Sequence, residues 1–575
     1  MKTAKLLAFL TALMLIAAAC GGGTDDTTTT AGGDAGEDTT TTAGGDGGDT
    51  TTTEGMDDMD FEGLSLDAGD CDYGGNVLSI TATDAHTVDF QLCKSDPAFL
   101  AKLAFDVFGI QPAEHLEATG GAPLDNPIGT GPWVLDEWVR GDSVNYVRND
   151  NYYGDVPAQT QLVLRWATEG AQRLVELQSG NADLITFPSQ DDWETIEGDE
   201  NLVLIPKDEA NILYVGFTNT FAPFDNPDVR KAIGMGIDRQ RIVDNFYPPG
   251  SEVASHFTPC TVENGCEGDS WYEFDAEAAR TMLADAGYPD GFETTIYYRD
   301  VFRGYLPEPG LVAVELQTQL AENLGIDATV QVMESGEFID EATSGRLDGI
   351  HLLGWTGDYP HVTNFLDFHF NADNPQFGVN DASYTEPLKE AAGIGDPAEA
   401  APFYAEANNA IKEFVPMVPI VHSKAAFAAQ ASLGGAYAPP WGQVKGSFMD
   451  NGGDTLVIVQ NAEPISLFCA DESDGESLRA CSQVVEGLYS YATDGSVQPQ
   501  LATECVPNED ASQWTCSLRD DVTFSDGSEF DANDVVATFT LGLDASSPLH
   551  VGNTGSFDYY AYLWGGLINA PTDEG

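Results

Sequence analysis

LGWTGDYPHVTNFLDFHF, at Leu353–Phe370, combines several aromatic rings with two glycines and an early carboxylate, Asp358. Glycine lets a ligand approach the backbone closely, and an aromatic ring forms a flat wall. A carboxylate in a partly dry cleft favours a cation as its partner. The combination indicates a site for a small molecule that carries an ammonium group. A buried turn whose carboxylate caps a neighbouring helix is the alternative, and composition alone does not separate the two.

The residues around this stretch predict an α/β protein. An apolar run at 349–354 predicts a strand that delivers Asp358 at its carboxyl end, where ligands of open α/β sheets tend to bind. Residues 161–187 alternate strand, helix and strand patterns. Residues 224–243 have the pattern of one helix, opened by an Asn-Pro pair.

Length and charge limit the classes of function. At 575 residues the chain is long enough for two or more lobes, and an apolar content of 42% is that of an ordinary globular protein. The 94 acidic residues outnumber the 23 basic residues, so the formal net charge is −71. A field of that sign repels nucleic acids and anionic membrane surfaces, so neither is expected as a partner. We interpret the charge as an adaptation of the surface to a salty exterior.

The N-terminus has the pattern of a secretory signal over residues 1–20. Two lysines precede the apolar run Leu6–Ile16, and small residues then lead to Cys20. This order resembles a bacterial lipobox, in which Cys20 is lipidated and becomes the first residue of the mature protein. Secretion with an unmodified cysteine is the alternative. Residues 21–60 repeat Thr, Gly and Asp with almost no apolar side chains, which predicts a disordered tether.

The cysteines indicate disulfides. Removing Cys20 from the nine cysteines leaves eight, an even number in an oxidising compartment. They lie in local pairs, and nearest-neighbour pairing is the favoured connectivity: Cys71 with Cys93, Cys260 with Cys266, Cys469 with Cys481, and Cys505 with Cys516. No CxxC or Cys/His spacing typical of a metal site occurs, so we expect no metal and no cofactor.

Several spaced motifs carry a family resemblance. They are GW-x-x-DYP followed by NFL within Leu353–Phe370, NP-x-GTGP-aromatic at Asn126–Trp133, and RN-x-x-YYG at Arg148–Gly154. With these motifs the chain resembles the peptide/nickel class (family 5) of extracytoplasmic solute-binding proteins, which feed ABC importers. In that family the aspartate of the first motif pairs with the free amino group of a bound peptide, a role that falls here to Asp358. The chain has His361 where the family commonly has an acidic residue.

The order of the motifs differs from that of the family. DTLVIVQ at Asp454–Gln460, with the motifs that follow it, resembles segments that open the mature protein in the family. Here these segments come after MVPIVHSKAAF at Met417–Phe427, which resembles a segment near the family's C-terminus. The resemblance therefore implies a circularly permuted chain order, with residues 450–453 as the joint between the old ends. Such a change costs little where the two ends are neighbours at the surface, and a scrambled gene model is the alternative.

The resemblance also implies a fold class and a division of the chain. The expected fold is α/β and two-lobed, like a periplasmic binding protein (type II, cluster C), with an extra subdomain in lobe I. Lobe II is expected at residues 258–427. Lobe I is expected to combine 161–257 with 428–484, and its extra subdomain to combine 72–160 with 485–575.

The same resemblance implies a binding site. Asp358 would hold a ligand ammonium group, Trp355 would form one wall, and the backbone of Gly354 and Thr356 would bond a peptide main chain like an added strand. Two residues of the opposite lobe match positions that line the cleft in relatives. The predicted ligand-binding residues are Asp358, Trp355, Gly354, Thr356, Tyr359, Glu463 and Ile465.

The expected function is capture of a peptide-like ligand by lobe closure, on the outer face of the bacterial cytoplasmic membrane. The expected partners are the ligand and the permease subunits of an ABC importer, with the lipid anchor as the sole membrane contact and a monomeric state. The alternatives are an oligosaccharide or metal chelate as ligand, or a sensor lipoprotein on the same fold. An enzyme is not expected, because no GxSxG, HExxH, Walker or GxGxxG pattern stands out in its proper context. His351, His361 and His369 are spaced too irregularly for a metal site on one helix.

Overall fold

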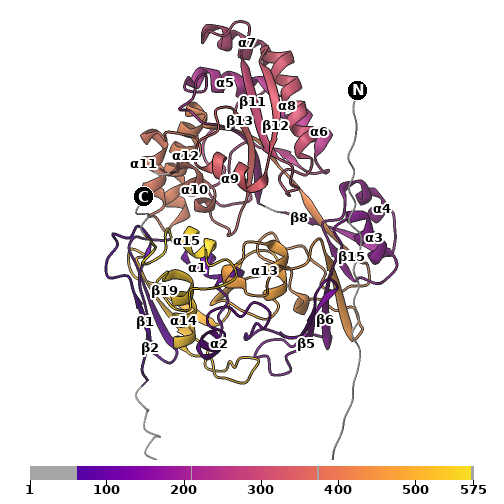
Figure 1. Ribbon diagram of the computed structural model, residues 1–575, viewed down its shortest axis with the longest axis vertical. Coiled ribbons are helices and arrows are strands. Elements are labelled where there is room, and N and C mark those ends of the chain that lie inside the picture. Colours follow the sequence, from indigo (N-terminus) through magenta and orange to yellow (C-terminus); the bar gives the residue numbers. More distant parts are fainter. Residues whose placement is uncertain (1–60, 209, 372–373, 572–575) are drawn as a thin grey trace, which may run out of the picture. The chain divides into compact units, whose positions relative to one another are not determined.

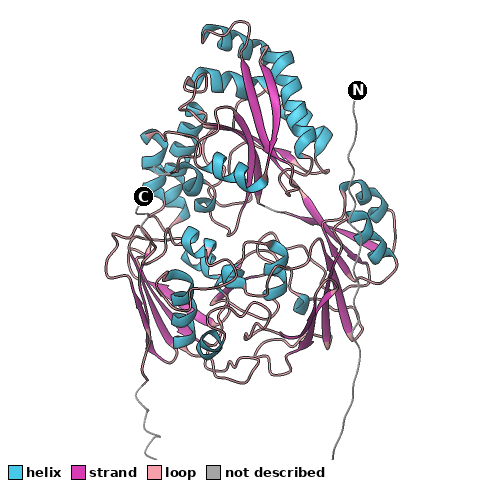
Figure 2. Cartoon of the chain, viewed as in Figure 1, coloured by secondary structure: helices cyan, strands magenta, loops and turns pink. Residues whose placement is uncertain are grey.

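The computed structural model describes residues 61–208, 210–371 and 374–571 (Figure 1). The predicted signal at 1–20, the predicted tether at 21–60 and the predicted lipidation site Cys20 lie outside these residues. Helices and strands are interspersed throughout the described chain (Figure 2). Within it, no helix is both long enough and apolar enough to cross a membrane.

A seven-stranded sheet combines early and late parts of the chain. Its order is β4 (Trp133–Val139), β5 (Ser143–Arg148), β6 (Gln161–Trp166), β16 (Thr455–Gln460), β7 (Leu184–Thr186), β15 (Ala425–Gln430) and β8 (Leu202–Lys207). β16 lies between β6 and β7 and is parallel to both. Five of the seven strands lie before residue 208 in the sequence, and only β15 and β16 come from the later part of the chain.

The second sheet has six strands and carries the Leu353–Phe370 stretch. Its order is β10 (Glu252–Val253), β14 (Met417–His422), β9 (Asn211–Phe217), β13 (Ile350–Thr356), β11 (Glu293–Arg299) and β12 (Asp327–Met333). Around it pack α5 (Pro227–Gly236), α6 (Arg239–Phe246), α7 (Ala276–Asp285), α8 (Pro309–Leu324), α9 (Ser335–Thr343), α10 (Leu366–Phe370), α11 (Ala382–Ala391) and α12 (Pro397–Phe414) (Figure 1). We call residues 210–422 lobe II.

Lobe II begins earlier than the sequence predicts. The expected boundary is residue 258, but β9, α5 and α6 already belong to the six-stranded sheet and its apolar core. β9 is buried along its whole length. A continuous apolar run is typical of any strand that is covered on both faces, so the run itself does not say which sheet the strand joins.

A five-stranded sheet forms the other part of lobe I, which we define as residues 61–208 and 423–571. Its order is β1 (Ser65–Asp67), β2 (Val77–Asp84), β3 (Thr87–Leu92), β20 (Gln513–Leu518) and β19 (Ala502–Pro507), with α14 (Ala532–Leu543) against it. The segment predicted as one subdomain, 72–160, divides between two sheets, because β4 and β5 join the seven-stranded sheet. The shorter elements of lobe I are α1 (Phe99–Leu103), η1 (Asp106–Phe108), α2 (Ala113–Ala118), α3 (Gly170–Gln178), η2 (Gln190–Asp192), α4 (Trp193–Glu197), η4 (Gly446–Phe448), η5 (Cys469–Asp471), α13 (Gly475–Cys481), β17 (Tyr489–Tyr491), β18 (Val497–Pro499) and α15 (Asp558–Leu563).

Two short segments connect the lobes, one between β8 and β9 and one between β14 and β15, and they are bonded to each other. Asn211 Nδ2 donates a hydrogen bond to Ser423 O at 3.0 Å, and Ser423 N donates to Asn211 Oδ1 at 2.8 Å. Lys424 and Asp208 form an ion pair at the same place. Because only these two segments link the lobes covalently, rotation about a few residues is enough to open or close the space between the lobes.

The four predicted disulfides are confirmed: Cys71–Cys93, Cys260–Cys266, Cys469–Cys481 and Cys505–Cys516. All four are local, so each closes a short loop of its own lobe. The single helix predicted over 224–243 is divided into α5 and α6. The side chain of Asp238 caps α6 by accepting a hydrogen bond from Arg241 N at 3.1 Å, and this cap starts a new helix where the sequence pattern shows no break.

Candidate functional site

The turn after β13 is held by one buried amide, Asn364 of η3 (Val362–Asn364). Its Oδ1 accepts hydrogen bonds from Asp358 N at 2.9 Å and from Trp355 Nε1 at 3.1 Å. Its Nδ2 donates to Asp358 Oδ2 at 3.1 Å. The Asn of the NFL motif therefore orients both Trp355 and Asp358, the two residues that the sequence analysis ranked first.

The Asp358 carboxylate lies where the two lobes meet. Its Oδ1 accepts a hydrogen bond at 3.0 Å from the hydroxyl of Tyr559, which is on α15 of lobe I. Burial raises the pKa of Asp358 to about 6, although the hydrogen bonds from Asn364 and Tyr559 favour the ionised form. In the described part of the chain, no lysine, arginine or histidine forms an ion pair with it. The described residues therefore hold a half-buried carboxylate that none of their own cations pairs with.

Aromatic rings from both lobes surround this carboxylate. Trp355 stacks on Phe368 of α10 with ring centroids 4.7 Å apart. Tyr562 of α15 meets both rings edge-on, at 5.8 Å from Trp355 and 4.4 Å from Phe368, and Figure 1 shows α15 beside α10. The hydroxyl of Tyr491 donates to Ala101 O at 2.7 Å and lies 3.5 Å from the Asp358 carbonyl oxygen. These contacts make the turn part of the interface between the lobes.

Tyr359 extends this insertion into lobe I. Its ring is buried in the apolar cluster of lobe I, although its backbone belongs to lobe II. The ammonium group of Lys102 lies 5.7 Å from the ring centroid. Beside it, Ser95 of lobe I donates to Gly393 O of lobe II at 3.3 Å. The lobes are thus in direct contact on this side of the site.

The backbone of Gly354 and Thr356 has a partner strand on one side. β9 pairs with β13 along its whole length, from Ile350 to Thr356. β11 pairs with β13 only at Ile350 and His351, so in the described structure the rest of β13 has no second partner strand. A Cβ at Gly354 would lie 2.3 Å from the Tyr305 ring, which explains why glycine is required there. The open edge is of the kind that an extended peptide pairs with.

Glu463 and Ile465 lie elsewhere on lobe I, in the loop after β16. Glu463 Oε1 accepts a hydrogen bond from Gly141 N at 3.0 Å. Ile465 is 58% exposed, and its N–H donates to Ser477 Oγ at 2.8 Å. The hydrogen bonds of Glu463 and Ile465 stay within lobe I. The structure therefore does not place these two residues beside Asp358, whereas Trp355, Gly354 and Thr356 lie on the strand that leads into Asp358.

Two arginines that the sequence analysis did not single out lie next to the site. Arg299, at the end of β11, donates to Ser335 Oγ at 3.1 Å and to the Tyr305 hydroxyl at 3.4 Å. Arg303 is exposed and donates to Phe302 O at 2.9 Å, and it interacts electrostatically with Arg299 and with Glu476 and Asp474 of lobe I. In the described residues neither arginine forms an ion pair. In a chain with 23 basic and 94 acidic residues, the sequence offers two arginines only four positions apart as a signal, but that neither forms an ion pair is visible only in the structure.

Among the described residues, none of the histidines of the central stretch belongs to a group of three or more potential metal ligands. Burial lowers the pKa of His351 to about 4 and that of His369 to about 3, so both are neutral at physiological pH. His369 Nδ1 lies 2.8 Å from Phe365 O, and His361 Nδ1 lies 2.9 Å from Thr363 Oγ1. His361 and His369 thus have local hydrogen-bond partners, whereas both ring nitrogens of His351 are buried without one in the described structure.

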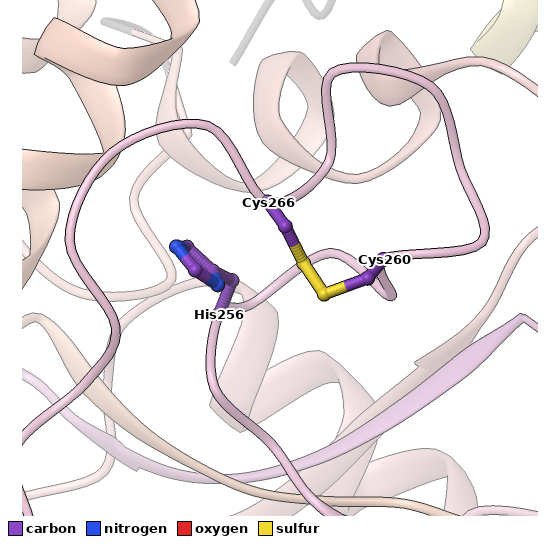
Figure 3. Close-up of side chains that lie close together, drawn as sticks. All are labelled: His256, Cys260 and Cys266. Atoms are coloured by element: carbon purple, nitrogen blue, oxygen red, sulfur yellow. A yellow bond between two sulfur atoms is a disulfide. The ribbon is translucent and has the colours of Figure 1, made fainter.

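His256, Cys260 and Cys266 come together in the loop that follows β10 (Figure 3). The potential ligand atoms of these three residues lie within 4.8 Å of one another. The two cysteines are bonded to each other, so neither offers a thiolate to a metal. His256 Nδ1 is 3.0 Å from Ser255 Oγ. This cluster is a disulfide beside a buried histidine.

Comparison with known proteins identifies the family. The chain matches the family described as bacterial extracellular solute-binding proteins, family 5 Middle, over residues 41–377 and 496–557. It is 30% identical over 356 residues to heme-binding protein A of Haemophilus influenzae, covering 60% of this chain and 65% of that protein. It is 32% identical over 359 residues to di/tripeptide-binding protein 1 of Pseudomonas aeruginosa, covering 60% and 66%. The chain thus spans about two thirds of the length of these relatives.

Solved structures agree with the fold. HbpA2 from Haemophilus parasuis superposes with a TM-score of 0.57 at 28% identity, covering 64% of this chain and 74% of that one. A dipeptide-binding protein from Pseudoalteromonas sp. SM9913, in complex with Met-Leu, gives a TM-score of 0.56 at 26% identity with the same coverage. The predicted two-lobed α/β fold is confirmed. The chain belongs to the bacterial extracellular solute-binding proteins of family 5.

Proposed function

We propose that the protein captures a peptide-like ligand between its lobes by binding the ligand's ammonium group at Asp358, and delivers it to an ABC importer. The observation that carries the proposal is a half-buried carboxylate, without an ion pair to a cation in the described residues, at the contact between two lobes that a pair of hydrogen-bonded segments connects. The names of several relatives, such as di/tripeptide-binding protein 1, support the ligand class.

Electrostatics explains why an ammonium group suits this position. Burying an ionised carboxylate without a counter-ion costs free energy, and this cost is the reason that the pKa of Asp358 is raised to about 6. An ammonium group beside the carboxylate removes the cost and forms charge-assisted hydrogen bonds. A hydroxyl or a neutral amide supplies the hydrogen bonds without the charge, so it binds less well.

The rest of the ligand would extend along β13. The open edge at Gly354 and Thr356 would pair with the peptide backbone, and Trp355 would form a wall of the site. Tyr305 connects this edge to the arginines, because its ring lies against Gly354 and its hydroxyl accepts a hydrogen bond from Arg299. We propose Arg299 and Arg303 as the partners of the ligand's carboxylate end.

The opposite lobe would complete the site. Tyr359 already reaches into lobe I, and Glu463 and Ile465 are proposed to approach the ligand from the loop after β16. The protein would be monomeric, held to the outer face of the cytoplasmic membrane by lipid on Cys20 after cleavage between Ala19 and Cys20, with residues 21–60 as a tether. One residue that carries several acyl chains is enough for stable anchoring.

A thermal-shift screen of residues 61–575 in high salt tests the ligand class. Dipeptides and tripeptides with a free amino group are expected to raise the melting temperature, because a ligand that binds only the folded state stabilises it by about 2.7 kcal/mol at 100 times its Kd. The matched controls are the same peptides with an acetylated amino group, which should give no shift. An equal shift with acetylated peptides, or a shift only with oligosaccharides or nickel chelates, would exclude the ammonium proposal and keep the fold.

We further infer that the chain order is circularly permuted. The N–H of Asn76 donates to Trp564 O at 2.6 Å, so the chain shortly before its C-terminal end lies beside the start of the first long strand. The proposed joint is exposed at Gly452 and Gly453, and Gly452 has a φ of 71°, which suits a tight closing turn. β16 in the centre of the seven-stranded sheet is compatible with an origin as the first strand.

A reordered variant tests the permutation. Residues 453–571 would be placed before residue 61 through a glycine-rich linker, so that β1 and Cys71 stay in the chain, and the reordered chain would end at Gly452. We expect a melting temperature within about 3 °C of the original chain, because the same contacts form in both orders. A control carries the same linker as an extension of the C-terminus. A reordered chain that does not fold would count against permutation. Absence of the tryptic peptide 446–479 from the native protein would indicate a scrambled gene model.

A further inference from the structure

Tyr559 is the one residue of lobe I in the described structure whose side chain bonds the Asp358 carboxylate. Its hydroxyl donates to Asp358 Oδ1 at 3.0 Å, across the contact between the lobes. Asp358 is the group to which the proposed function assigns the ligand's ammonium. The Tyr559 hydroxyl thus occupies a hydrogen-bonding position on the carboxylate that an incoming ammonium group would use.

The position of Tyr559 is well defined, because the chain before α15 is anchored to η5. Asp471, 4% exposed, accepts hydrogen bonds from Gly555 N and Phe557 N, both at 2.8 Å. It also accepts one from the hydroxyl of Thr554 at 2.9 Å. The ring of Tyr559 packs edge-on against Phe105 with centroids 4.8 Å apart. The hydroxyl is therefore presented by a rigid support rather than by a free loop.

Lobe I contributes neutral tyrosine side chains to the surroundings of Asp358. Three tyrosine side chains of lobe I interact electrostatically with the carboxylate: Tyr491, Tyr559 and Tyr562. All three are neutral at physiological pH because burial raises their pKa values above the ordinary one. In the described residues, lobe I thus brings a neutral hydrogen-bond donor to Asp358, but no cation.

We propose that Tyr559 is a specificity-determining latch: its hydroxyl holds the lobes together through Asp358 in the ligand-free protein, and a ligand binds by replacing it with an ammonium group. The inference rests on the proposed function for the identity of the ligand group, but the latch itself is independent of the ligand. A ligand without a positive charge would only replace the Tyr559 hydroxyl by another neutral hydrogen-bond donor to Asp358, so this exchange adds little to its binding free energy. The latch therefore raises the selectivity for amines while it weakens the affinity for every ligand.

The variant Tyr559→Phe tests the latch, and Tyr560→Phe on the same helix is the matched control. Tyr560 is fully buried, and its hydroxyl has no hydrogen-bond partner in the described structure, so the control removes the same atom without a latch. Small-angle X-ray scattering of the ligand-free proteins should give a larger radius of gyration for Tyr559→Phe than for the original chain and for Tyr560→Phe. An unchanged radius for Tyr559→Phe would overturn the proposal. Circular dichroism verifies that both variants are folded.

Ligand binding gives a second, separate readout. By calorimetry, Tyr559→Phe should bind a free-amine dipeptide about 10-fold more tightly than the original chain does. The reason is that the ligand no longer has to displace a hydrogen bond to a charged group, and such a bond corresponds to about this factor. Weaker binding would show that the hydroxyl supports the ligand, which overturns the latch. If neither protein binds peptides, the proposed function fails, and scattering still decides whether Tyr559 holds the lobes together.

Discussion

Replacing Asp358 with asparagine is expected to abolish amine-dependent ligand binding and, at the same time, to stabilise the protein at neutral pH. Asparagine keeps the shape of the side chain and can still accept the hydrogen bond from Tyr559. It carries no charge, so it gives an ammonium group no ionic partner, and the peptide-induced increase in melting temperature should disappear. The gain in stability arises because the variant no longer buries an uncompensated carboxylate.

The pH dependence of this gain follows from the raised pKa. Burial raises the pKa of Asp358 from its ordinary 3.8 to about 6, so the folded protein binds the proton more tightly than the unfolded chain does. The original chain therefore loses stability as the pH rises from about 4 to 6, and the loss is complete above the folded-state pKa. Asp358→Asn should match it near pH 4 and exceed it by on the order of 2 kcal/mol at pH 7 and above.

The control is Asp367→Asn. Asp367 is a second buried carboxyl in the same region, on α10, and burial raises its pKa to about 7. Its replacement should also stabilise the protein at high pH, but the response to dipeptides should remain. Urea denaturation of the three proteins between pH 4 and 8 and thermal shifts with dipeptides separate the two effects. A dipeptide shift that survives in Asp358→Asn would exclude Asp358 as the amine site.

Replacing Arg230 with methionine is expected to destabilise lobe II by about 3 kcal/mol or more. Arg230 is 1% exposed and carries no ion pair in the described structure. Its Nε donates to Val415 O at 2.7 Å, its Nη1 donates to Phe224 O at 2.6 Å, and its Nη2 donates to Phe414 O. The guanidinium group thus ties α5 to the end of α12, and methionine would leave these carbonyl groups buried without donors.

The neighbouring Lys231 provides the matched control for this effect. Its ammonium group pairs with Glu413 at 3.2 Å, but the Glu413 side chain is 72% exposed, and such surface pairs contribute at most about 1 kcal/mol. Lys231→Met should therefore shift the urea midpoint far less than Arg230→Met. Equal midpoints for the two variants would show that the buried hydrogen bonds of Arg230 are replaced by water or by relaxation of the backbone.

The sequence by itself determined the features that depend on neighbours along the chain. The spacing of Trp355, Asp358 and Asn364 places three polar contacts within one turn, and those contacts form as local hydrogen bonds. The cysteines pair with their nearest neighbours, because short loops close with little loss of entropy. The strand and helix patterns, together with the motifs, were enough to predict the family and the two-lobed fold.

Only the tertiary structure decided what faces the turn. Tyr559 lies 201 residues from Asp358, and no periodicity or motif relates the two positions. The placement of β9 in lobe II, and of Arg299 and Arg303 beside the site, likewise depends on which sheet each strand joins. Local patterns report which face of an element is buried, whereas contacts across a hinge depend on how two separately folded lobes meet. That is why the sequence could single out Asp358 as a candidate, but the tyrosine that bonds to it is visible only in the folded chain.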